Sequence, residues 1–191
     1  MTHRFADKTF TDGVKAAQEV YGSRPHNERL QSNFGPNDQL GPKEIDFIAR
    51  RDTFYLATVG ETGWPYVQHR GGPAGFLRVI GDNCLAYADF RGNTQLISVG
   101  NVSDNDRCSL ILMDYPNRRR LKILGHMRVE DARSAGNGDL TIVELSDYKA
   151  RIERVVFIDV VAFDWNCPQH ITRRYTESEF EEQSATTVFE K

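Results

Sequence analysis

The sequence predicts a mainly β fold, in which six or seven antiparallel strands form a small closed or split barrel with helices around it. One observation is that stretches rich in β-branched and aromatic residues follow one another closely between residues 53 and 165. A second is that turns containing glycine, proline or asparagine separate successive stretches, as in hairpins. Consecutive hairpins favour an antiparallel barrel over a parallel sheet, because parallel strands need long crossover connections.

Seven segments fit the strand pattern, and short turns such as Gly60–Gly63, Gly81–Asn83 and Tyr115–Asn117 join them in pairs. The predicted strands are Thr53–Val59, Pro65–Arg70, Phe76–Ile80, Cys84–Asp89, Arg107–Asp114, Leu121–Glu130 and Val155–Trp165.

Residues 1–40 are expected to form an N-terminal arm and helix. Val14 and Tyr21 have helical spacing behind Thr11, whose hydroxyl can cap a helix. Residues 22–42 are rich in glycine, proline, asparagine and serine, which predicts an extended loop.

The barrel domain is predicted to occupy residues 41–175. Pro42 can open a helix at its start, because proline suits the first helical position. A second short helix is expected from about Thr94 to Val102, between two of the hairpins.

The last third of the chain is predicted to be more irregular. Residues 131–141 resemble a loop, and a short helix is expected over Ser146–Arg151. Thr176 and Glu179 have the spacing of a capping box, so residues 176–191 are expected to form a C-terminal helix and tail.

Composition and charge argue against several protein classes. Lys and Arg total 24 and Asp and Glu total 27, which gives a formal net charge of −3. This balance does not supply the basic surface that non-specific nucleic-acid binding needs. Hydrophobic residues make up 39% of the chain, enough for one core, so a globally disordered chain is not expected.

The sequence also predicts a cytoplasmic protein that has no membrane span. No apolar run approaches the roughly 20 residues that cross a bilayer. Met1–Phe10 lacks an apolar stretch typical of a signal peptide. The three cysteines, Cys84, Cys108 and Cys167, are an odd number and are expected to be free thiols.

Several common site motifs are missing from the sequence. It contains no glycine-rich dinucleotide fingerprint, no phosphate-binding P-loop and no His-Glu-x-x-His zinc motif. Cys167 and His170 have Cys-x-x-His spacing, but no further ligands complete a metal site. We therefore interpret them as a free thiol beside a surface histidine.

The segment Gln68–Gly72 is the first candidate site, because it puts an amide, an imidazole and a guanidinium next to small residues. Alternation along a strand sends Gln68 and Arg70 to one face and His69 to the other. Small residues allow a flat ligand or a phosphate to approach the backbone. A solvated strand end with a glycine turn is the alternative.

The segment Asp89–Gln95 is the second candidate, at a predicted junction between a strand and a helix. Helix N-termini offer free N–H donors and the positive end of a dipole. Arg91 with nearby polar side chains could hold a phosphate there. Ordinary capping by Asn93 or Thr94, with Arg91 in solvent, is the alternative.

The basic run Arg118–Lys122 is the third candidate. A solvated hairpin end is the leading interpretation. A patch for nucleic acid or an acidic ligand is the alternative, and a single patch on a net-acidic chain supports it weakly.

The order and spacing of six segments together resemble the pyridoxamine 5'-phosphate oxidase-like family of FMN-binding split-barrel proteins. The Gln-His-Arg-Gly-Gly and Arg-Gly-Asn sequences are the most specific of them. The matching segments are Phe54–Val59, Gly63–Gly72, Ala88–Asn93, Leu112–Tyr115, Leu121–Gly125 and Cys167–Ile171.

The resemblance implies a six-stranded split barrel, a homodimer, and one FMN in each of two clefts between the subunits. Gln68, His69 and Arg70 match the strand that lines the flavin. Arg91, Asn93 and Gln95 match the junction that holds its phosphate. The C-terminal pair that matches a segment reaching a flavin, either its own or the partner subunit's, is Gln169 and His170.

This chain departs from the true oxidases of the family. Those have an Arg-x-Val-Leu-Leu-Lys strand where this chain has Gln68–Pro73, and their C-terminal substrate signature of Arg and Trp ending in Leu-x-Pro is not visible here. The resemblance therefore implies another branch, with a substrate other than pyridoxine or pyridoxamine phosphate.

Two functions follow from these expectations. The first is a homodimeric FMN-dependent oxidoreductase that acts on a small molecule, with NADH or NADPH as a possible electron donor. The second is a flavin- or haem-binding module without turnover, such as a sensor or carrier. Deazaflavin or haem in place of FMN stays open at this point.

Overall fold

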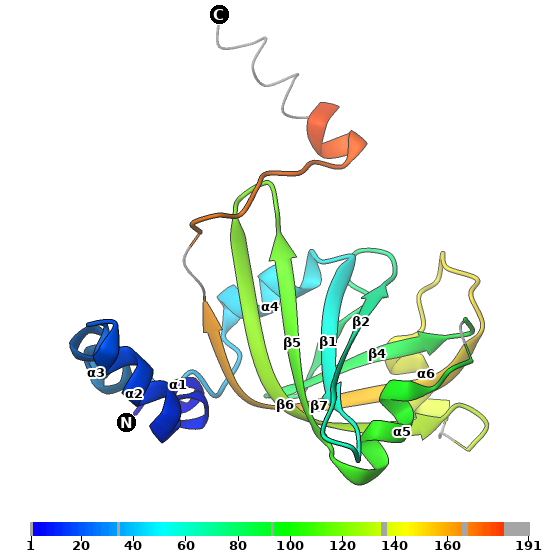
Figure 1. Cartoon of the computed structure of the whole chain (residues 1–191). Helices are drawn as coiled ribbons and strands as arrows, with labels where there is room; N and C mark the ends of the chain where they lie inside the picture. Colours follow the sequence, from blue (N-terminus) through cyan, green and yellow to red (C-terminus); the bar gives the residue numbers. More distant parts are fainter. Residues whose placement is uncertain (1, 34, 93, 135–136, 166–167, 182–191) are drawn as a thin grey trace, which may run out of the picture.

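The chain forms one antiparallel sheet that curls around a hydrophobic core, with helices at its periphery (Figure 1). The computed structural model describes residues 2–33, 35–92, 94–134, 137–165 and 168–181. The helices are α1 (Arg4–Thr9), α2 (Asp12–Val20), α3 (Arg24–Asn33), α4 (Pro42–Ala49), α5 (Ile97–Asp104) and α6 (Asn137–Val143). The strands are β1 (Thr53–Val59), β2 (Pro65–Gly71), β3 (Arg78–Ile80), β4 (Cys84–Phe90), β5 (Arg107–Asp114), β6 (Arg119–Asp131) and β7 (Ile152–Trp165).

The strands are hydrogen-bonded in the order β2-β1-β5-β6-β7-β4-β3, and every neighbouring pair is antiparallel. The outermost strands, β2 and β3, lie at opposite ends of this order, so the barrel is split between them. The predicted fold class is confirmed. Within the described residues the sheet has seven strands, within the predicted six or seven and one more than the resemblance implies; the seven include the three-residue strand β3 at the edge of β4.

Strand β6 pairs with β7 along most of its length, and a bulge at Gly125 bends this long ribbon. The register between the two strands shifts between Leu124 and Gly125. A Cβ atom on Gly125 would lie 2.6 Å from Cγ2 of Ile158 and 2.8 Å from the carbonyl oxygen of Asp159. Glycine is therefore required there, and the bulge increases the local twist that curls the sheet.

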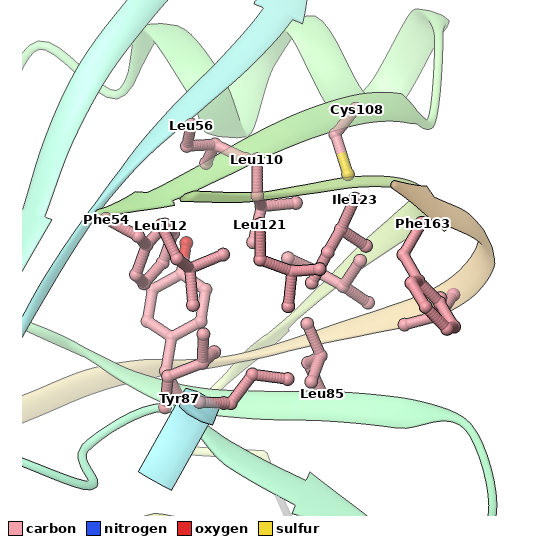
Figure 2. Close-up of a cluster of buried hydrophobic side chains, with 14 of the residues drawn as sticks. Phe54, Leu56, Leu85, Tyr87, Cys108, Leu110, Leu112, Leu121, Ile123 and Phe163 are labelled. Atoms are coloured by element: carbon pink, nitrogen blue, oxygen red, sulfur yellow. The ribbon is translucent and has the colours of Figure 1, made fainter. Parts of the chain in front are cut away.

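The core lies inside the curled sheet and follows from alternation along each strand. In β1, Phe54 and Leu56 are fully buried while their neighbours are half-buried. Figure 2 shows these side chains converging with Leu110, Leu112 and Leu121 from β5 and β6. Period-two patterning in the sequence thus becomes one continuous apolar interior.

The N-terminal 40 residues contain three helices beside one end of the barrel (Figure 1). The prediction of an extended loop over residues 22–42 is wrong, because α3 occupies Arg24–Asn33. Its first turn is held by the ion pair of Arg24 with Glu28, and Asn27 donates to the carbonyl of Ser23. Side-chain bonds to the backbone and between neighbouring turns outweigh the low helix propensity of this segment.

The predicted loop at residues 131–141 and the predicted helix at Ser146–Arg151 are both wrong. The helix in this region is α6, which begins at Asn137 and buries Val143 completely. Arg78 of β3 donates to the carbonyls of Ile142 and Glu144, which satisfies the end of α6. A contact from a distant strand therefore sets where this helix forms.

The strand predicted at Phe76–Ile80 begins only at Arg78. Gly75, with φ of +81°, turns the chain so that Phe76 and Leu77 enter the core instead of extending the strand.

The capping box is confirmed: Thr176 and Glu179 exchange hydrogen bonds, and residues 177–181 are helical. Among the described residues, no helix is long and apolar enough to cross a membrane.

Candidate functional site

A cavity of about 220 Å³ lies between β2 and β4, two strands that are not neighbours in the sheet, and the start of α5. One wall is polar and is formed by Gln68, Arg70, Asp89 and Arg154. The other wall is apolar and is formed by Phe76, Tyr87, Phe90, Leu96 and Ile97.

Strand β2 presents alternate side chains to this cavity. Gln68 and Arg70 are half-buried and His69 is exposed, which confirms the predicted alternation. The Nε2 atom of His69 lies at hydrogen-bond distance from the hydroxyl of Thr53, and its ring meets Tyr55 edge-on. His69 therefore borders the cavity while being tied to β1.

Three charged side chains from three strands meet at the polar wall. Nη1 of Arg70 donates to Oδ1 of Asp89 at 2.8 Å, and Nε of Arg154 donates to Oδ2 of the same carboxylate at 2.7 Å. The exposed fractions are 16% for Arg70, 6% for Asp89 and 19% for Arg154. Two guanidinium groups surround one carboxylate at a site largely withdrawn from water, and the carboxylate of Glu153, 3.3 Å from Nη2 of Arg154, balances the second guanidinium. We call Arg70, Asp89 and Arg154 the mouth triad.

The mouth triad has an unsatisfied hydrogen-bond donor. Nε of Arg70 is buried and has no partner among the described residues. An unpaired buried donor costs about 1–3 kcal/mol, and more for a charged group. Arg70 and Arg154 also line the cavity and have more N–H donors than the carboxylates use, so the site is suited to an anion.

The start of α5 forms the opposite side of the cavity. Leu96, just before the helix, has φ of +56°, a conformation in which bulky residues are rarely found. Ser98 in the first turn is buried, and its hydroxyl donates to Oε1 of Gln68 at 3.3 Å. The side-chain oxygen of Gln68 accepts this hydrogen bond. The amide nitrogen of Gln68 can therefore donate toward a ligand.

Gly71, the last residue of β2, and Gly72 make room for neighbouring side chains. A Cβ atom on Gly72 would lie 2.8 Å from Cγ of Phe76, and one on Gly71 would lie 3.0 Å from Cε1 of His69. Phe76 itself stacks on Phe54 with ring centroids 5.6 Å apart. Gly71 and Gly72 thus make room for His69 and for the aromatic floor of the cavity; Gly71 also lines the cavity, and the prediction that these glycines admit a ligand to the backbone stays a prediction.

The sequence matches the family model described as "Pyridoxamine 5'-phosphate oxidase" over residues 41–154. The chain belongs to the pyridoxamine 5'-phosphate oxidase family. A comparison with curated proteins finds no match.

Solved structures of this oxidase family share the fold. HupZ from Group A Streptococcus is 16% identical, with 71% of this chain and 99% of that chain covered and a TM-score of 0.53. A protein assigned to the pyridoxamine 5'-phosphate oxidases from Lactobacillus delbrueckii is 18% identical, with 70% and 97% covered and a TM-score of 0.52. At these identities the likeness establishes the fold alone.

Within this oxidase-family fold, the predicted phosphate-binding residues do not gather in the cavity. Arg91 has a side chain that is 67% exposed, with its Nε 3.9 Å from Glu153, and it does not line the cavity. Gln95 is also exposed and outside the lining. Asn93 lies outside the described residues. The roles predicted for these three residues stay predictions.

The predicted C-terminal pair does not line this cavity in the same chain. Gln169 and His170 are exposed, in a segment that follows β7 and runs beside the turn between β5 and β6 (Figure 1). In that segment the guanidinium of Arg174 lies 5.1 Å from the ring centre of Tyr115. A role of the pair at a flavin therefore requires the partner subunit's cavity, and it also stays a prediction.

Sequence reasoning missed Arg154, and it did not connect Asp89 with Arg70. The last strand was predicted to begin at Val155, one residue after Arg154, whereas β7 begins at Ile152. Extending the alternation of that strand backwards would have placed Arg154 on the same face as the buried Val156. That alternation was the available signal.

We call the basic run Arg118–Lys122 the basic hairpin. Its side chains make contacts within the protein. Arg119 lies over the rings of Phe47 and Trp165, at 5.2 and 4.8 Å. Lys122 pairs with Asp164 at 2.9 Å. This agrees with the leading interpretation as a hairpin end.

Among the described residues, no group of His, Cys, Asp and Glu could hold a metal ion, and Cys167 lies outside them.

Proposed function

We propose that this chain is an FMN-dependent oxidoreductase that acts on a small molecule. The observation that carries the proposal is the mouth triad: two largely buried guanidinium groups around one carboxylate, lining a cavity of an oxidase-family fold. FMN joins a phosphate dianion to a flat ring system. The cavity offers guanidinium groups for the first and an aromatic wall for the second.

The polar wall fits the phosphate group of FMN. Arg70 and Arg154 each keep N–H groups beyond those used by Asp89, and charge-assisted hydrogen bonds are the strong ones. Arg91 and Asn93 remain predicted phosphate contacts from the neighbouring junction, with Gln95 beside them.

The remaining walls fit the ring system. Phe76 and Phe90 provide aromatic surface, while Leu96 and Ile97 form an apolar rim that limits access of water. Gln68 can donate from its amide nitrogen to a ring acceptor. Bound FMN supplies the redox step, taking up or releasing a hydride or electrons at its ring. We assign no protein acid or base, and His69 contacts substrate or ring at the rim.

We also propose that the protein is a homodimer with FMN between the subunits. Trp64, just before edge strand β2, and Val67 on that strand are 78% and 62% exposed, and Leu96 and Ile97 at the cavity rim are exposed as well. Apolar side chains that cluster at a rim are typical of protein interfaces. A partner subunit there would close the cavity and could bring its own Gln169 and His170. Light scattering during size-exclusion chromatography should give twice the mass of the chain.

Identification of the bound chromophore tests the cofactor. The purified protein should be yellow, and FMN should be released from it on denaturation and identified by chromatography. A colourless protein that does not take up added FMN, or one that releases haem or deazaflavin, would refute the proposal.

Anaerobic reduction separates the enzyme from a carrier. If NADH or NADPH bleaches the flavin and an added small-molecule acceptor restores its colour, the protein turns over. A flavin that neither nicotinamide reduces would instead favour the flavin-binding module without turnover.

The cytoplasmic location is part of the same proposal, and fractionation of cells tests it.

A further inference from the structure

We propose that Arg154 is the residue that makes this cavity select a phosphorylated flavin over an unphosphorylated one. The inference rests on the proposed function for the identity of the ligand, and on the geometry of the mouth triad for the role of Arg154. It assigns the decisive charge to β7, outside both sequence segments that predicted the phosphate site.

The charge count of the mouth triad gives Arg154 this role. With Arg154, the triad and Glu153, which lies 3.3 Å from Nη2 of Arg154, carry two positive and two negative charges, and without Arg154 their net charge is −1. Without Arg154, Arg70 and Asp89 form a neutral pair at 2.8 Å. A neutral pair has little attraction for a phosphate dianion, whereas the flavin ring depends on the apolar wall. Loss of Arg154 should therefore weaken FMN binding and leave riboflavin binding nearly unchanged.

The geometry leaves Arg154 with donors to spare. Its Nε donates to Oδ2 of Asp89 at 2.7 Å, and its Nη2 donates to Oε2 of Glu153 at 3.3 Å. A guanidinium has five N–H groups, so three remain after these two bonds to described residues. The side chain is 19% exposed and lines the cavity, so those donors lie where water screens them little.

Arg91, the arginine predicted from sequence, is placed less well for this selection. Its side chain is 67% exposed, and 3.9 Å separates its Nε from the carboxylate of Glu153. An exposed charge beside an opposite charge interacts weakly with a third group. We therefore expect Arg154 to contribute more to phosphate selection than Arg91.

The test compares FMN with riboflavin in four variants. Arg154→Gln removes the charge and Arg154→Lys keeps it, while Arg91→Gln tests the alternative arginine. Arg133→Gln is the matched control, because Arg133 is a nearby exposed arginine that pairs with Asp131 and does not line this cavity. The ratio of the two flavin dissociation constants is measured by fluorescence titration, and the flavins that co-purify are identified by chromatography.

We expect Arg154→Gln to reduce the preference for FMN by about 10- to 100-fold, the effect of losing a hydrogen bond to a charged group. Arg154→Lys should restore part of it, and Arg91→Gln should change it less than about threefold. An unchanged preference in Arg154→Gln, or a larger loss in Arg91→Gln, would overturn the proposal. Circular dichroism of each variant confirms that it is folded.

Inorganic phosphate gives a second measurement that does not depend on flavin. Phosphate should raise the melting temperature of the wild-type protein above that in chloride of equal ionic strength, and Arg154→Gln should abolish this rise. If the wild type binds phosphate through Arg154 but binds no flavin, the flavin proposal fails and the anion site stands. If phosphate has no effect beyond ionic strength, the role of Arg154 is refuted even where flavin binds.

Discussion

The mouth triad and the basic hairpin both contain arginines, but they use the charge in opposite ways. In the basic hairpin, five consecutive residues include four with positive charge, and Arg119 and Lys122 are spread over rings and a carboxylate near the surface. In the mouth triad, three residues far apart in sequence meet at a buried carboxylate. A local concentration of charge in sequence is thus no guide to concentration in space.

Desolvation explains the difference in function. Charges in water are screened and gain little from one another, so the hairpin arginines contribute mainly through their contact with rings. Charges withdrawn from water interact more strongly and cannot be left unbalanced. In the mouth triad two largely buried guanidinium groups share one carboxylate, and a ligand can accept from their remaining N–H donors.

The largest expected effect is that of Asp89→Asn. This change leaves two largely buried guanidinium groups without their carboxylate, which should lower the free energy of unfolding by about 3 kcal/mol. Chemical denaturation measures it. The matched control is Asp164→Asn, which removes the partner of Lys122 beside the basic hairpin and should cost about 1 kcal/mol. Equal losses in the two variants would remove the distinction between the regions.

In the basic hairpin, Arg119→Ala should lower the free energy of unfolding by about 1 kcal/mol, because its guanidinium lies over two rings at an exposed site. Arg118→Ala is the control, since Arg118 occupies the turn with φ of +53°. The wild type should show no salt-dependent affinity for an oligonucleotide. Tight binding at low salt that either substitution weakens would restore the nucleic-acid interpretation.

A stabilising change is expected beneath the mouth triad. The hydroxyl of Tyr87 is buried without a partner among the described residues, and Figure 2 shows the side chain extending toward Phe54 and Leu112. Tyr87→Phe removes this unsatisfied group and should raise the free energy of unfolding by about 1 kcal/mol. A decrease instead would show that the hydroxyl is hydrogen-bonded, for example to a buried water.

The smallest effect concerns two thiols, Cys84 on β4, the strand of Asp89, and Cys108 at the start of β5, opposite Gly125 of β6. Burial raises the pKa of Cys84 from 9.0 to about 11 and that of Cys108 to about 12. Because the folded pKa values are raised, this contribution to stability is complete below pH 9 and is lost as pH rises through about 11 to 12.

Thiol reactivity measures this effect. In a Cys167→Ser background, both thiols should react slowly with a disulfide reagent at pH 8 and rapidly once the protein is denatured. As pH rises above 9, the denaturation midpoint should fall less in the variant with both cysteines replaced by alanine than in the protein that keeps them. Fast reaction of the folded protein at pH 8 would contradict the burial of these groups.

Much of the fold could be predicted, because it depends on local patterns. β1 and β5 have the predicted bounds, since period-two alternation and adjacent turns define a half-buried strand. Pro42 opens α4 as expected. The misplaced helices near residues 22–42 and 131–151 depend instead on contacts that alternation does not encode, such as the bonds from Arg78 to the end of α6.

The sequence by itself determined the antiparallel barrel class, the faces of Gln68, His69 and Arg70, and the free thiols of Cys84 and Cys108. These follow from periodicity and composition, which act over a few residues. Only the tertiary structure decided which charges meet. The pairing of β4 with β7 sets Asp89 opposite Arg154, and the curl of the sheet brings Arg70 of β2 to them. Their desolvation, on which the proposed function depends, exists only in the folded protein.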